Sequence, residues 1–62
     1  MQLRLLDPVY TDRLAAYLRS VGQRPLVAGP DSVELDAEQA EVEVYLRVWK
    51  VLYPDAEVEI LQ

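Results

Sequence analysis

The chain has 62 residues, which is room for a single small α+β domain over residues 1–62 and no linker. It has no cysteine and no histidine, so disulfides and the usual ligands of zinc and transition metals are excluded, and we expect no metal and no cofactor. Eleven acidic and six basic side chains give a net charge of −5, which argues against a nucleic acid as the partner.

The first element expected is a strand over residues 2–6, where Leu3 and Leu5 alternate with polar side chains. A helix should follow, with Asp7 or Thr11 as its N-cap, and Gly22 should end it in the left-handed conformation. A helix that covers one core needs one apolar face. The residues on that face are Tyr10, Leu14, Tyr17, Leu18 and Val21.

Residues 24–36 are interpreted as a β-hairpin with its turn at residues 29–32. Pro25 has no amide hydrogen to donate, so the first strand of the hairpin should lie at a sheet edge. Val33 and Leu35 of the second strand should point inward. Residues 56–61 alternate again and predict a last strand.

The resulting order is β-α-β-β-α-β. It predicts a ferredoxin-like two-layer sandwich, in which both helices cover one face of an antiparallel sheet with strand order 4-1-3-2. This fold hosts many unrelated functions and cannot choose among them.

The second helix is expected over residues 36–53, with Asp36 as its N-cap, Gln39 as a weak capping-box match, and Pro54 as its end. At about 100° per residue its apolar side chains form two adjacent stripes. The first stripe is Ala40, Val44, Val48, Val51 and Leu52. The second stripe is Val42, Leu46, Trp49 and Tyr53, with Tyr45 between the two.

Together the stripes span on the order of 200°, about twice what a surface helix needs to face one core. One stripe is therefore surplus, unless this tiny domain buries both. Because Trp and Tyr are enriched at interface hot spots, we expect the surplus to be the second stripe. The predicted interface residues are Val42, Tyr45, Leu46, Trp49 and Tyr53.

The function favoured is a non-enzymatic protein–protein interaction module, which forms a homodimer or other homo-oligomer or docks on a larger protein. Pairing of the last strand with a partner sheet is a second route, which Glu57 and Glu59 oppose. The alternative function is a regulatory domain that binds a small-molecule ligand at a dimer interface, although the connection after the first strand, with Asp7 and Pro8, is bulky and poor in donors.

Enzymatic chemistry is disfavoured because the usual activated groups, His and Cys, are missing. The open sheet face should carry Arg4 with Glu34, Glu57 and Glu59, which is interpreted as a solvated, ion-paired surface. Residues 1–6 are too short for a secretory signal, and no apolar run is long enough to cross a bilayer. We therefore expect a cytoplasmic protein with no membrane partner.

Overall fold

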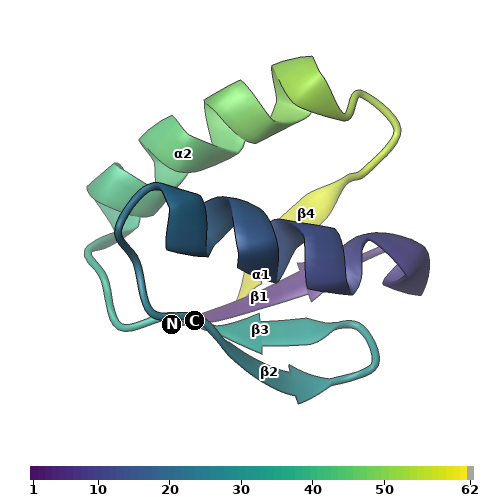
Figure 1. Cartoon of the computed structure of the whole chain (residues 1–62), viewed down its shortest axis with the longest axis horizontal. Coiled ribbons are helices and arrows are strands. Elements are labelled where there is room, and N and C mark those ends of the chain that lie inside the picture. Colours follow the sequence, from purple (N-terminus) through teal and green to yellow (C-terminus); the bar gives the residue numbers. More distant parts are fainter. Residues whose placement is uncertain (62) are drawn as a thin grey trace.

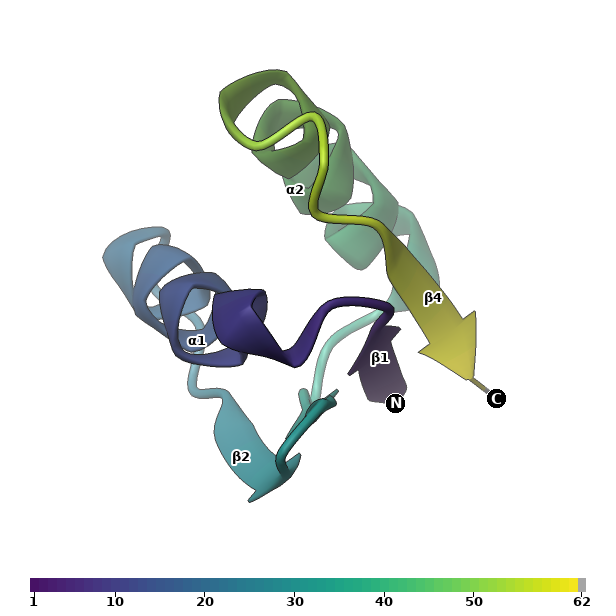
Figure 2. The same ribbon diagram turned by 90° about the vertical axis from the view of Figure 1, so that its right-hand side faces the viewer.

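The computed structural model describes residues 1–61 and shows two layers, with both helices on one face of a four-stranded sheet (Figures 1 and 2). A short 3₁₀ helix, η1, precedes the first α-helix. The elements in chain order are β1 (Gln2–Leu5), η1 (Pro8–Tyr10), α1 (Thr11–Ser20), β2 (Leu26–Gly29), β3 (Ser32–Glu34), α2 (Gln39–Leu52) and β4 (Val58–Leu61).

The sheet is antiparallel throughout and has the order β2-β3-β1-β4, which confirms the predicted strand order read from the other edge. Its centre is β1, where Leu3 lies between Val33 of β3 and Ile60 of β4. The strand preceded by Pro25 is at an edge, as its missing amide hydrogen requires. β4 lies at the opposite edge of the sheet.

The core lies between the sheet and the two helices. Leu3 and Val33 point up from the sheet, and Leu14 and Leu18 point down from α1, all with no exposed surface. The cluster of buried residues is Leu3, Leu5, Leu14, Leu18, Val33, Leu35, Val42, Trp49 and Ala56. The inward positions predicted for Val33 and Leu35 are therefore confirmed.

Neither N-cap candidate caps α1: its N-cap is Tyr10, with no side-chain hydrogen bond, and Thr11 is its first residue, because the 3₁₀ turn η1 comes between Asp7 and the α-helix. Asp7 caps η1, since its carboxylate accepts a hydrogen bond from the backbone N–H of Val9 at 3.1 Å. The α-helix itself begins at Thr11. At its other end Gly22 adopts φ of +88°, the left-handed region that a Cβ disfavours, and the N–H of Gln23 donates to the carbonyl of Leu18 at 3.0 Å.

The predicted start of the second helix is wrong. Its N-cap is Glu38, Asp36 lies before the helix, and Gln39 is the first helical residue. The reason is the path of the chain. Leu35 is buried and its N–H donates to the carbonyl of Met1 at 2.9 Å, which holds it in the sheet layer. Residues 36–38 are therefore needed to connect the sheet to the helix layer. The end of the helix is near the predicted one, at Leu52 just before Pro54.

Thr11 ties the start of α1 to the hairpin turn. Its side chain is 4 % exposed, and Oγ1 donates to the carbonyl of Pro30 at 2.8 Å. We expect Thr11→Val, which keeps the shape but loses this bond, to lower the free energy of unfolding by about 1 kcal/mol in urea titration. Ser20→Ala is the control, because that hydroxyl is exposed and bonds within the same helix. Equal unfolding midpoints for the wild type and Thr11→Val would contradict this role.

Candidate functional site

The second stripe of α2, which the sequence assigns to an interface, is part of the core. Val42 is fully buried and Trp49 is 1 % exposed. The indole N–H of Trp49 donates to the carbonyl of Ala56 at 3.0 Å. The centroid of its ring lies 5.6 Å from the ring centroid of Tyr17 and 4.4 Å from that of Tyr53. The core of a single copy of the chain therefore buries both side chains, and neither can contact a partner protein in the folded state.

The other three predicted interface residues border the same core. Tyr45, Leu46 and Tyr53 are partly buried and packed against it. The carbonyl of Tyr45 accepts a hydrogen bond from the hydroxyl of Tyr17 at 2.8 Å, which joins α2 to α1. Burial, with a smaller contribution from Tyr45, raises the pKa of the Tyr17 hydroxyl above its usual value.

Side-chain volume explains why the prediction chose the wrong stripe. A domain of 62 residues has few positions from which to fill its interior, so its largest side chain belongs inside. Trp49 also has a buried carbonyl partner in Ala56. Aromatic residues indicate interface hot spots only where other side chains already fill the core. Relative volume, large in the second stripe and small in the first, was the signal that could have decided the question.

The surplus apolar surface does exist, and it is the first stripe. Val51 is 79 % exposed, and Val44, Val48 and Leu52 are 54 %, 50 % and 57 % exposed. Val51 lies about 160° around the helix from Trp49, on the side that faces away from the sheet. Within the described chain no other helix or strand covers this side of α2 (Figures 1 and 2).

Polar side chains border the first stripe along its β4 side and near its N-terminal end on the α1 side. On the β4 side, Glu43, Arg47 and Lys50 line one shallow surface, and Lys50 pairs with Glu57 at 3.6 Å. On the α1 side, Glu41 accepts a hydrogen bond from the hydroxyl of Tyr45 at 2.9 Å. An apolar strip with a polar rim is the usual layout of a protein-binding surface.

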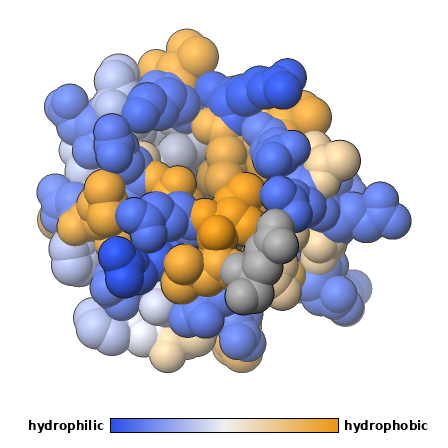
Figure 3. Space-filling view, turned by 180° about the vertical axis from the view of Figure 1, so that it is seen from behind, coloured by the Kyte–Doolittle hydropathy of each residue, from blue (hydrophilic) through white to orange (hydrophobic). Residues whose placement is uncertain are grey.

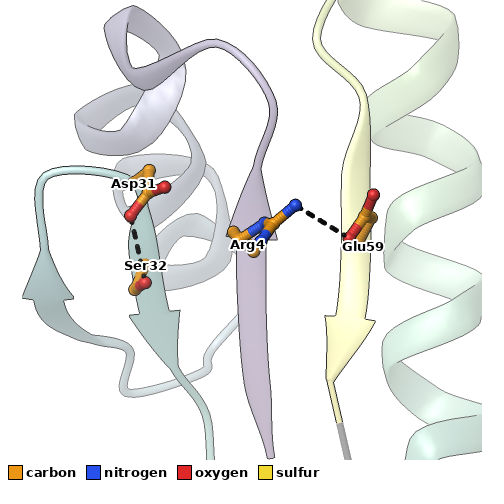
Figure 4. A network of polar contacts seen from close by, with 4 residues as sticks. All are labelled: Arg4, Asp31, Ser32 and Glu59. Carbon is orange, nitrogen blue, oxygen red and sulfur yellow. Dashed lines mark hydrogen bonds and ion pairs between the residues drawn. The ribbon is translucent and has the colours of Figure 1, made fainter.

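The open face of the sheet is a solvated, ion-paired surface. Arg4 of β1 lies directly opposite Glu59 of β4, and their charged atoms are 3.4 Å apart (Figure 4). Both side chains are 47 % exposed, so the pair contributes little to stability. Glu57 does not join it but pairs with Lys50 of α2. Glu57 and Glu59 are thus held in two separate weak ion pairs.

The other exposed large apolar residues in the described chain are Leu26 and Val27 in the edge strand β2, and Leu6 and Val9 at η1 and just before it. β2 exposes Leu26 and Val27, but it is short, sits between Pro25 and Pro30, and is bulged after Val27. These features discourage pairing with another strand.

The face turned away from the viewer in Figure 1 also carries an apolar patch ringed by hydrophilic residues (Figure 3). β4 lies on this side (Figure 2), and Glu59 within the strand opposes unselective pairing.

Comparison with models of known protein families, with curated proteins and with solved structures found no match to the chain. Among residues 1–61, no group of three or more acidic side chains converges as a set of metal ligands. In the same part of the chain, no helix is long and apolar enough to cross a membrane. The first stripe of α2 is the surface feature that most needs an explanation.

Proposed function

We propose that the protein is a non-enzymatic interaction module that self-associates, with two copies packed through the first stripe of α2. The observation that carries this proposal is the exposure of Val44, Val48, Val51 and Leu52, each at least half exposed on one side of one helix. Single exposed apolar residues are ordinary on protein surfaces, whereas a contiguous strip with a polar rim marks an interaction site.

The size of the domain supports the same proposal. A chain of 62 residues buries only about 60 % of the surface that its unfolded form exposes, so its stability alone is marginal. The sequence contains no cysteine that could cross-link it. Packing two first stripes together removes apolar surface from water, and each 100 Å² removed contributes about 2.5 kcal/mol before the costs of association. A second copy supplies this stabilisation without another partner.

The fold is compatible with this role. We infer a ferredoxin-like sandwich, supported by the β-α-β-β-α-β order and the antiparallel order β2-β3-β1-β4. Two helices on one side of a sheet leave an outer side on each helix. In α1 that side carries the charged residues Asp12 and Arg19, and in α2 it carries the valines of the first stripe. The two helices thus differ in the surface they offer.

Val51→Glu is the test of the proposal. Val51 is 79 % exposed, so the change should leave the fold intact while placing two carboxylates, one from each copy, in an apolar interface. We expect the dissociation constant of the dimer to rise by about a hundredfold. The measurement is solution mass by light scattering over a dilution series, with far-UV circular dichroism to verify folding.

The matched control is Val9→Glu in η1, because Val9 is a valine of similar exposure, 70 %, outside α2. It receives the same change in charge and should self-associate like the wild type. A wild-type protein that stays monomeric at millimolar concentration would overturn the proposal. So would a Val51→Glu variant with the same dissociation constant as the wild type.

A further inference from the structure

We infer that the two copies pair with their α2 helices antiparallel across a two-fold axis, and that Glu43 and Lys50 specify this orientation. The inference rests on the proposed function, because it describes how that same surface selects its partner. It follows from the distribution of charge along α2, because the apolar stripe alone does not determine the orientation of the pair.

The charges of α2 separate along its length. The N-cap and first half of the helix carry Glu38, Glu41 and Glu43 and no basic side chain. The second half carries Arg47 and Lys50 and no acidic side chain. This follows the usual preference for acids near a helix N-terminus and bases near its C-terminus. It also gives one helix an acidic end and a basic end.

An antiparallel pair places the acidic half of each α2 beside the basic half of the other. Glu43 and Lys50 are seven residues apart on the same flank of the first stripe, about 10 Å along the axis. In an antiparallel pair centred near residue 47, Glu43 of each copy lies near Lys50 of the second copy, and symmetry forms this contact twice. A parallel pair would lose both of these contacts, because the same flank of the two helices then lies on opposite sides of the interface. It would also set the acidic half of one α2 beside the acidic half of the other, which is unfavourable.

Both side chains are available for such a contact. Lys50 is 56 % exposed, and its pair with Glu57 at 3.6 Å is a weak surface interaction that can be exchanged for another. Glu43 is exposed and accepts a long hydrogen bond, 3.4 Å, from the side-chain amide of Gln39. Packing α2 against α2 also sets the two helix dipoles in opposite directions, which is the favourable arrangement.

Reversing the two charges one at a time tests the orientation. We expect Glu43→Lys and Lys50→Glu each to raise the dissociation constant of the dimer by about tenfold in low salt, because each replaces two attractive contacts with two repulsive ones. The first change makes an acidic chain less acidic, and the second makes it more so. If only overall repulsion mattered, Glu43→Lys would instead tighten the dimer.

The double variant Glu43→Lys with Lys50→Glu restores opposite charges in the antiparallel arrangement and keeps the net charge. We therefore expect its dissociation constant to return to within about threefold of the wild-type value. All of these effects should shrink in high salt, because exposed charges are screened. Folding of each variant is verified by far-UV circular dichroism.

Cysteine cross-linking provides a second readout, since the chain has no cysteine of its own. Residues 44 and 51 lie near opposite ends of the first stripe, so in an antiparallel pair position 51 is near position 44 of the second copy. Under oxidising conditions an equimolar mixture of Val44→Cys and Val51→Cys chains should form the mixed disulfide in excess over either homodimer. In a parallel pair each variant would cross-link with itself, because disulfides need Cα atoms within about 7 Å.

The outcomes separate this inference from the proposed function. A wild-type dimer that Val51→Glu dissociates, but that neither charge reversal weakens, would keep the interface and overturn the antiparallel arrangement. Efficient self-cross-linking of Val51→Cys would overturn it as well. A monomeric wild type would overturn both proposals at once.

Discussion

Replacing Trp49 with alanine is expected to unfold the protein. The side chain is 1 % exposed and lies in the core, in ring contact with Tyr17 and Tyr53. Truncating a buried tryptophan costs about 3–5 kcal/mol, and here it also leaves the carbonyl of Ala56 without its indole donor. At about 0.05–0.15 kcal/mol per residue, a 62-residue domain has only about 3–9 kcal/mol in total.

The measurement is urea unfolding followed by far-UV circular dichroism, because the substitution removes the single tryptophan that fluorescence would report. Val9→Ala is the control, since Val9 is 70 % exposed and lies outside both α2 and the core. Its unfolding free energy should stay within about 0.5 kcal/mol of the wild-type value. A Trp49→Ala protein with an unchanged midpoint would mean that the indole ring is not part of the core.

The strand order could be predicted because its signals are local. Alternation at Leu3 and Leu5 identifies a half-buried strand, Pro25 places the next strand at an edge, and Gly22 marks the end of α1. Each signal depends on the residue itself and on its immediate neighbours. Once four strands and two helices are recognised, short right-handed connections leave few arrangements.

The start of α2 could not be predicted in the same way. Asp36 is of the right type for an N-cap, but the position of a cap also depends on where the preceding residue is held. Leu35 is fixed in the core and bonded to Met1, and these two residues are far apart in the sequence. The helix therefore begins only at Gln39. A non-local contact of this kind leaves no trace in the pattern around residue 36.

Which of the two stripes faces the core also depends on non-local contacts. Periodicity shows that α2 has more apolar surface than one core requires, and the exposure of Val44 and Val51 confirms that one stripe is surplus. It does not show which stripe turns inward, because both are apolar and adjacent. That depends on the space between α2 and the sheet, which the rings of Trp49 and Tyr53 help to fill and which small valines would leave partly empty.

Val42→Glu and Val44→Glu form the sharpest comparison of the two stripes. The two valines lie two residues apart in the first half of the same helix, so both changes have the same chemistry and nearly the same effect on helix propensity. Val42 has no exposed surface, whereas Val44 is 54 % exposed. A carboxylate at position 42 would be buried without a partner, at a cost of several kcal/mol.

We therefore expect Val42→Glu to be unfolded, with poorly dispersed amide resonances and no thermal transition. Val44→Glu should be folded, with the unfolding free energy of the monomer within about 0.5 kcal/mol of the wild-type value when compared at low protein concentration. Because Val44 belongs to the first stripe, the same variant should also dimerise more weakly than the wild type. The reverse pattern, a folded Val42→Glu and an unfolded Val44→Glu, would mean that α2 turns its first stripe toward the sheet. In that case the second stripe, with Trp49, would be the exposed surface.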